Sequence, residues 1–152
     1  MSVPPLRLAA ATASPPDRAE LISRSHERST AFGLQSNMVP DFSAAGRGEL
    51  NNVREKNESL HRHAMPIMEM LYEQIVDTHS MVVLTDACGT ILHSVGDRDF
   101  LARAAKVALT PGVNWAEQAK GTNAIGTALI EERPILVHAH EHYLSANHFL
   151  TC

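Results

Sequence analysis

Three histidines stand two residues apart in the segment His138-Ala-His140-Glu-His142, and histidine is the commonest metal ligand in proteins. In an extended strand, residues two apart point to the same face, so the three imidazoles would line one surface. The segment lacks the HExxH signature, however, and no carboxylate has the spacing of a known zinc site. We therefore predict no metal site here and expect these side chains to be structural, solvent-facing or hydrogen-bonded to an organic ligand.

A glycine-rich segment, Gly121-Thr-Asn-Ala-Ile-Gly126-Thr, has the outline of a phosphate-binding loop. The lysine that such a loop needs after its second glycine is missing, because Lys120 precedes the first glycine instead. Nucleoside triphosphate binding is therefore not expected. The segment predicts a helix start with Thr122 or Asn123 as its cap, whose first amides could bind a small anion or a carbonyl.

The two cysteines, Cys88 and Cys152, do not stand in a recognised nucleophile motif, and GxSxG is absent. Cys88 falls in a predicted tight turn, and no cation stands beside it in the sequence to activate it as a nucleophile. Two cysteines without a CxxC pair also exclude a cysteine metal site and are compatible with a reducing cytosol. We expect no enzymatic activity and no cofactor.

The composition describes an ordinary globular chain of one domain, with 152 residues and a formal net charge of −4. Lys and Arg number 13 against 17 Asp and Glu, and no basic run is long enough to make a phosphate-binding patch. Direct contact with nucleic acid is therefore not expected. No apolar stretch approaches the roughly 18 to 20 residues that cross a bilayer, so we expect no membrane association and a cytoplasmic location.

The first half of the chain predicts a disordered tail over residues 1–16 and helices over residues 17–79. A polar helix over 17–32 ends at Gly33, and its Arg24–Arg28 stretch is interpreted as a solvated face. A long helical region over 49–79 should kink or break near 62–65, because Pro66 removes a backbone donor. This region carries a heptad seam, which either packs on its own domain or pairs two copies in a dimer. The seam consists of Leu50, Val53, Asn57, Leu60, Ala64, Ile67 and Leu71.

The second half predicts an antiparallel sheet. Residues 81–85 and 90–95 are two arms of a hairpin, and Asp97 can cap the helix that follows. An irregular segment over 109–120 precedes a helix over 124–132, a third strand over 134–138 and the start of another over 149–152. A hairpin followed by helices favours an α+β fold, with helices packed on one side of an antiparallel sheet.

Several of these segments together resemble the GAF domain of acetoin-catabolism-type regulators, which belong to the sigma-54-dependent transcription activators. The resemblance covers about residues 20–152, and its most specific part is the 121–129 block together with Trp115 and Glu141-His142. The matching segments are Val82-Val-Leu-Thr-Asp86-Ala-Cys-Gly89, Gly112-x-x-Trp115-x-Glu117, Gly121-Thr-Asn-Ala-Ile-Gly126-Thr-Ala-Leu129, Glu141-His142-Tyr143, Leu150-Thr-Cys152, and, upstream, Arg24-Ser-His26-x-Arg28 and Pro66-x-x-x-x-Leu71-Tyr72.

This resemblance implies a GAF-like fold, and we expect its core to occupy residues 80–152. From the heptad seam we expect the N-terminal helices over 17–79 to pair in a dimer. In such regulators the domain receives a small organic signal or a partner protein and controls an AAA+ ATPase, while contacts with DNA and with the sigma-54 polymerase belong to other domains. Family members continue past the Leu-Thr-Cys block into a further hairpin, so the core is expected to be truncated before that hairpin.

Our leading hypothesis is a small-molecule-sensing domain whose ligand is a hydroxyketone, a diol or an aromatic compound. The candidate ligand-binding residues are Trp115, Asn123, His140, His142 and Tyr143. The alternatives are a protein-interaction module with a vestigial pocket, or a GAF-type redox enzyme that would need the two cysteines. Trp115 could instead anchor a loop in the core, and Asn123 could be only a helix cap.

Overall fold

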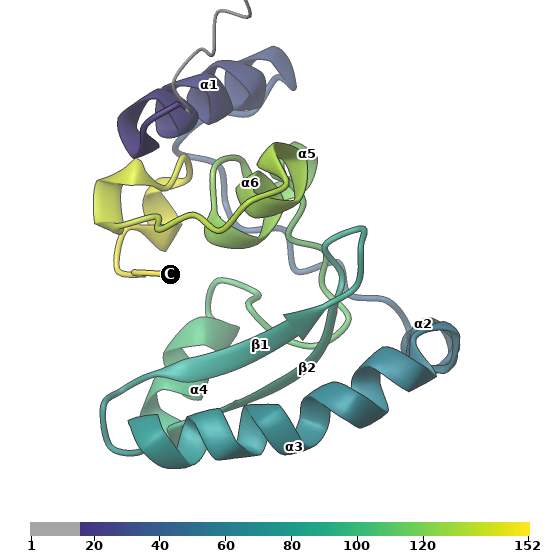
Figure 1. The fold of residues 1–152 in the computed structure, drawn as a ribbon. Helices are drawn as coiled ribbons and strands as arrows, with labels where there is room; N and C mark the ends of the chain where they lie inside the picture. The colour runs from purple at the N-terminus through teal and green to yellow at the C-terminus, as the bar shows by residue number, and fades with distance from the viewer. Residues whose placement is uncertain (1–15) are drawn as a thin grey trace, which may run out of the picture.

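The computed structural model describes residues 16–152. Apart from Pro16, the predicted tail therefore lies outside the described residues. The elements run in the order α1 (Arg18–Ala31), α2 (Arg47–Lys56), α3 (Glu58–Ile75), β1 (Met81–Thr85), β2 (Ile91–Gly96), α4 (Arg98–Ala105), α5 (Glu117–Lys120) and α6 (Ala124–Glu131), followed by the short 3-10 helices η1 (Ala139–Glu141) and η2 (Ser145–Asn147). In Figure 1, α1 lies with α5, α6 and the C-terminal segment at one end of the molecule, and α3 follows the two strands at the other end.

The hairpin forms as the sequence predicts. β1 and β2 pair in antiparallel register from Met81 opposite Gly96, with an irregularity between Leu84 and Thr85. The turn is closed by the Asp86 carboxylate, which accepts hydrogen bonds from the amides of Cys88 and Thr90, both at 2.9 Å. The expected α+β fold with a small antiparallel sheet is confirmed.

The two faces of the hairpin have different neighbours. α3 packs along β1 and β2, and the Met68 side chain at this contact is 4% exposed. The main hydrophobic cluster includes Ile91 of β2, Ala104 of α4, Trp115 and Leu150, each at most 1% exposed. Both faces of the two-stranded sheet are therefore covered by packed residues, and this burial stabilises a hairpin that would be at best marginally stable in water by itself.

Of the predicted kink or break near Pro66, the break is wrong: α3 continues through this position, and the helical region divides at Asn57 instead. Asn57 leaves the helical region of backbone space (φ −109°, ψ 22°), and its side-chain amide donates to the Val53 carbonyl at 2.8 Å. Such local side-chain bonding competes with the helix and favours its interruption. Pro66 lies inside α3 on an exposed position, where the carbonyl that loses its amide partner can bond to water.

The heptad seam does not pack on its own domain along α3. Leu60, Ile67 and Leu71 are 46%, 55% and 42% exposed, whereas the stripe that includes Met68 faces the sheet. α3 therefore carries two apolar stripes, of which one holds the domain together and the other is open.

Asp97 occupies the position before α4, but its carboxylate does not cap that helix. It accepts hydrogen bonds from the Tyr72 hydroxyl (3.0 Å) and from the amides of Asp77 (3.1 Å) and His79 (2.8 Å). The predicted capping role is therefore wrong. The turn between α3 and β1 has positive φ values at Asp77 and His79, and its unpaired amides compete successfully for the carboxylate.

The predicted third strand over 134–138 does not join the sheet. Its end pairs briefly with the last residues of the chain, through Val137 to Cys152 in both directions (2.9 and 3.0 Å) and Ala139 to Leu150 (2.9 Å). Ala139 has a φ of +44°, which turns the chain into η1 and stops the extended conformation. The two segments therefore form one short antiparallel bridge and not a pair of regular strands.

Within residues 16–152, no helix has the length and apolar character that crossing a membrane would require.

Candidate functional site

A cavity of about 650 Å³ lies between β1, α4 and the C-terminal segment. This volume falls within the range of small-molecule sites in proteins, roughly 300–1,000 Å³. Most of the lining side chains are apolar, and a minority are polar. The lining residues are Ile75, His79, Ser80, Met81, Val83, Phe100, Arg103, Leu109, Ile125, Phe149, Leu150, Thr151 and Cys152.

Trp115 and Asn123 are brought together beside this cavity. They line a smaller hollow of about 20 Å³, which shares Leu109, Ile125 and Leu150 with the main cavity. The indole N–H of Trp115 donates to the Ala108 carbonyl at 2.9 Å. Trp115 therefore forms part of the inner wall as a rigid apolar surface.

Asn123 uses its whole side chain to organise the start of α6. Its Oδ1 accepts from the amides of Ile125 (2.9 Å) and Gly126 (3.0 Å), and its Nδ2 donates to the carbonyls of Trp115 and Gly121 (both 2.9 Å). The side chain is 2% exposed. Its donors and acceptors are thus engaged within the protein, and it positions the wall of the hollow.

The other three candidate residues lie away from the cavity. The Tyr143 hydroxyl donates to the Leu34 carbonyl at 2.9 Å. His140 is exposed, and its Nδ1 lies 2.9 Å from Nδ1 of His148. His142 is 1% exposed, and its Nδ1 lies 3.0 Å from the Ala139 carbonyl. The five sequence candidates therefore separate into two groups: Trp115 and Asn123 line the hollow that shares residues with the cavity, and the other three line neither.

The extended conformation on which the histidine face depends is absent from the described chain. Ala139–Glu141 forms a 3-10 turn, so His138, His140 and His142 point in different directions and have different partners. Among residues 16–152, no group of three histidine, cysteine, aspartate or glutamate side chains is arranged to hold a metal ion.

The buried His142 gives the domain a pH dependence with a definite sign. Burial lowers the pKa of its imidazole below the ordinary value of 6.5. The unfolded chain therefore binds a proton more readily than the folded one, and stability falls as the pH drops below about 6.5. We expect the urea midpoint of the wild type to decline between about pH 7 and pH 5, and less steeply in His142→Gln. The exposed His63→Gln is the matched control, and an equal decline in all three proteins would contradict this assignment.

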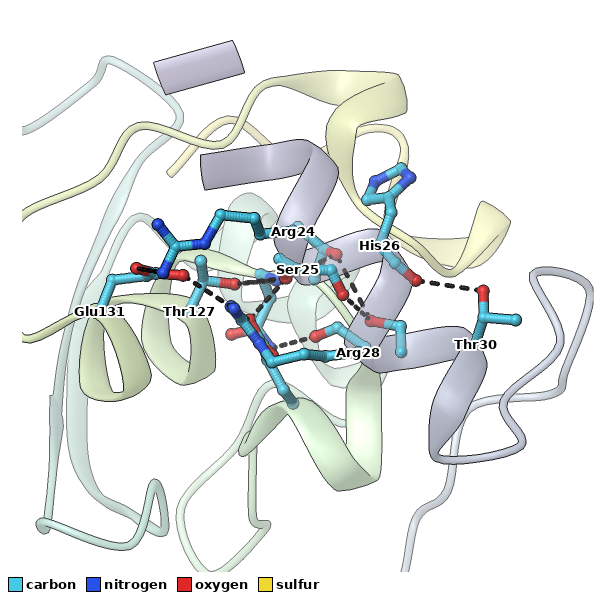
Figure 2. A network of polar contacts seen from close by, with 12 residues as sticks. Arg24, Ser25, His26, Arg28, Thr30, Thr127 and Glu131 are labelled. Carbon is cyan, nitrogen blue, oxygen red and sulfur yellow. Dashed lines mark hydrogen bonds and ion pairs between the residues drawn. The ribbon is translucent and has the colours of Figure 1, made fainter. Parts of the chain in front are cut away.

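A polar network joins α1 to α5 and α6, and it overturns the interpretation of the Arg24–Arg28 stretch as a solvated face (Figure 2). Arg28 donates to the Glu117 carboxylate at 2.7 and 2.9 Å and to Glu131 at 2.8 Å. Arg24 also reaches Glu131 at 3.0 Å. The Ser25 hydroxyl, which is fully buried, lies 2.5 Å from Glu117. This face of α1 therefore packs against α5 and α6 within the same domain.

The charges of this network stabilise one another. Burial by itself would raise the pKa of Glu117, but hydrogen bonds from Arg28 and Ser25 outweigh it and the net pKa is lowered. The hydrogen bond with Glu117 raises the pKa of Arg28 in turn. A sequence signal for the network exists in Ser25 and Ser29, small polar residues four apart beside the apolar Leu21 and Ile22. Both serines are fully buried.

Lys120 fixes the segment that follows α1. Its side chain is 1% exposed, and its ammonium group donates to the Asp41 carbonyl at 2.6 Å and lies 5.6 Å from the Trp115 ring centroid. Burial lowers the pKa of this lysine. Together with the bond from Tyr143 to Leu34, this contact holds residues 34–41 against the body of the domain.

The fold has a close match among solved structures. The E. coli DhaR(N)–DhaL complex contains a chain that superposes with a TM-score of 0.80, covering 84% of this chain and 43% of that one at 19% identity. This likeness defines the class of fold.

The sequence then identifies the family. Residues 16–152 match the family described as "MimR, N-terminal domain", so the chain belongs to the N-terminal domains of MimR-type regulators. The expectation of a GAF-type domain of such regulators is confirmed.

Several curated relatives are named as transcriptional regulators. The chain is 37% identical to the propane 2-monooxygenase operon transcriptional activator MimR of Mycolicibacterium smegmatis, over 70% of this chain and 19% of that protein. It is 35% identical to the acetoin dehydrogenase operon transcriptional activator AcoR of Bacillus subtilis, over 68% of this chain and 17% of that protein. A signal-transduction and transcriptional-control protein of Clostridium beijerinckii is 28% identical over 88% of this chain and 21% of its own length. The chain thus spans about a fifth of the relatives that it matches.

Proposed function

We propose that this domain receives a small organic signal for a bacterial transcription activator. The observation that carries the proposal is the 650 Å³ cavity between β1, α4 and the C-terminal segment. Its apolar walls and few polar groups have the character of a small-molecule site. The relatives named as operon activators support a regulatory role. The signal would control an AAA+ ATPase domain of a sigma-54-dependent activator in the cytoplasm.

The position of the cavity suits a sensor because its wall is made of segments far apart in the sequence. Val83 of β1, Phe100 of α4, Ile125 of α6 and Phe149 near the end of the chain all line it. A ligand that contacts all of them would stabilise one arrangement of α4 and α6 relative to the sheet. Binding to one arrangement more tightly than to another is the physical basis of a ligand switch. Trp115 and Asn123 would hold the inner wall in place.

A thermal-shift screen tests the proposal. Hydroxyketones, diols and phenols are added to the wild type, to Val83→Phe, which fills the cavity, and to Val82→Phe, which enlarges a neighbouring residue of β1 that does not line it. A ligand at 100 times its dissociation constant adds about 2.7 kcal/mol of stability. We expect a melting temperature higher by several degrees in the wild type and in Val82→Phe, but not in Val83→Phe. If no compound raises the melting temperature, the small-molecule proposal fails.

The alternative is a protein-interaction module whose cavity takes no ligand. It would leave the melting temperature unchanged throughout the screen and would require a defined protein complex. The redox alternative finds less support. Cys88 and Cys152 are both free thiols. Cys152 is exposed overall yet lines the cavity, and burial of its thiol raises the pKa to about 11, which disfavours the reactive thiolate at neutral pH.

We further propose that two copies pair along the open stripe of α3. Leu60, Ile67 and Leu71 recur at heptad spacing and are exposed, so two such stripes could bury one another. We expect a dimer in light scattering and at least tenfold weaker association in Ile67→Glu. The control Leu129→Glu places the same charge at an exposed apolar residue of α6 and should remain dimeric. A monomeric wild type would refute this pairing.

A further inference from the structure

Among the residues of the described chain that line the cavity, Arg103 is the only lysine or arginine. Arg103 of α4 lines it, and the guanidinium carbon lies over the Phe149 ring, 4.9 Å from the centroid, and 5.9 Å from the Phe100 centroid. Among residues 16–152, no carboxylate lies within ion-pair distance of Arg103. Its guanidinium also donates no hydrogen bond within these residues, where the arginine side chains that do so are Arg18, Arg24, Arg28 and Arg54. Arg103 differs in this respect from Arg28, whose guanidinium is occupied by two carboxylates.

Stacking leaves the donors of Arg103 available. A guanidinium that lies over an aromatic ring uses its face for the contact, and its five N–H donors point outward in its own plane. Their fork matches the two oxygens of a carboxylate. Two phenylalanine rings therefore hold the group in place without consuming its hydrogen-bonding capacity.

The other polar side chains of the cavity are engaged elsewhere. His79 is paired with Asp99, with Nδ1 and Oδ2 2.5 Å apart. The Thr151 hydroxyl contacts His138 Nδ1 at 2.8 Å, and the Ser80 hydroxyl contacts Thr78 at 3.0 Å. Within residues 16–152, no aspartate or glutamate lines the cavity. The unoccupied hydrogen-bond donors of the described lining thus belong to the cation Arg103, and most of the other lining residues are apolar.

From this arrangement we infer that the ligand is a small monocarboxylic acid with a branched aliphatic or aromatic body. This inference rests on the proposed sensor function and names its ligand class. The carboxylate binds the fork of Arg103, and the body fills the space between Val83, Leu109 and Ile125. A dianion would leave its second charge against an apolar wall, where burying an unpaired charge is costly.

The test compares acids with neutral molecules of the same shape. 4-Methylpentanoate is measured beside 4-methylpentan-1-ol, and phenylacetate beside phenylacetamide, by thermal shift and by calorimetric titration. The proteins are the wild type, Arg103→Gln and Arg98→Gln. Arg98 lies on the same helix but does not line this cavity, so it controls for general charge effects.

We expect at least one acid to bind the wild type and Arg98→Gln roughly tenfold or more tightly than its neutral partner, and this preference to disappear in Arg103→Gln. Equal binding of acids and neutral partners, unchanged in Arg103→Gln, would overturn the inference while leaving a small-molecule sensor intact. Loss of acid binding in both variants would also overturn it, because binding would then follow net charge. If neither acids nor neutral compounds bind, the proposed function fails and the inference fails with it.

Discussion

Replacing Glu117 with alanine is expected to lower the free energy of unfolding by about 3–5 kcal/mol, the usual effect of removing one partner from a buried ion pair. The Glu117 side chain is fully buried, and Arg28 and Ser25 both donate to it. Without the carboxylate, Arg28 keeps only its contact with Glu131, and the buried Ser25 loses its shortest hydrogen bond. Urea unfolding followed by circular dichroism measures this loss.

The matched control is Arg18→Ala, on the same helix. Arg18 pairs with Glu141 at 2.7 Å, but its side chain is 48% exposed, so this pair should contribute at most about 1 kcal/mol. A similar loss in both variants would show that the burial of Glu117 is not what matters.

The pH dependence of stability provides a second test of the network around Glu117. Because the folded pKa of Glu117 is lowered, its stabilisation is present above the ordinary value of 4.5 and is lost as the pH falls. The difference in stability between the wild type and Glu117→Ala should therefore shrink below about pH 4.5.

Replacing Gly126 with alanine is the second change for which we expect a large effect, and its sign is opposite to helix propensity. Alanine is favoured over glycine in a helix by about 1 kcal/mol. At this position of α6, however, an added Cβ would lie 2.5 Å from the Glu117 amide nitrogen and 2.8 Å from the Trp115 carbonyl oxygen. These are backbone atoms that cannot rotate away. We expect a net destabilisation of about 2 kcal/mol or more, measured by urea unfolding.

Gly48 in α2 is the matched control, because nothing lies within 4 Å of the Cβ that Gly48→Ala would add. That change should raise stability by about 0.5–1 kcal/mol. A stabilising effect at both glycines would mean that the close packing of α6 on the 115–117 segment is not rigid.

The sequence predicts the features of this fold that depend on local spacing. The hairpin follows from the β-branched run before Asp86, and the end of α1 follows from Gly33. The break at Asn57 is less visible, because an asparagine at a heptad seam predicts a paired helix equally well. Only the bond from its side chain to Val53 decides between the two outcomes.

The residues of the candidate site are harder to predict from their spacing in the sequence than the helices and strands are. Trp115 and Asn123 are eight positions apart, and the structure places them together. Arg103 and Phe149 belong to segments whose meeting depends on the whole fold, so their contact has no signal in the spacing of residues. His140 and His142 are attractive in sequence because an extended strand would align them, and one residue with positive φ, Ala139, prevents that alignment.

The docking of α1 has a consequence for how the chain is made. The ion pair between Arg28 and Glu117 can form only after Glu117 has been synthesised, 89 residues after Arg28. At a synthesis rate of roughly 5–20 residues per second, this delay lasts about 5–20 s. During this interval the helix surface that will later be buried is rich in hydroxyl and guanidinium groups, which water solvates well. Apart from Leu21 and Ile22, this interface exposes few apolar side chains before it is buried, so it offers little surface to chaperones or neighbouring chains and the delay carries a small risk of aggregation.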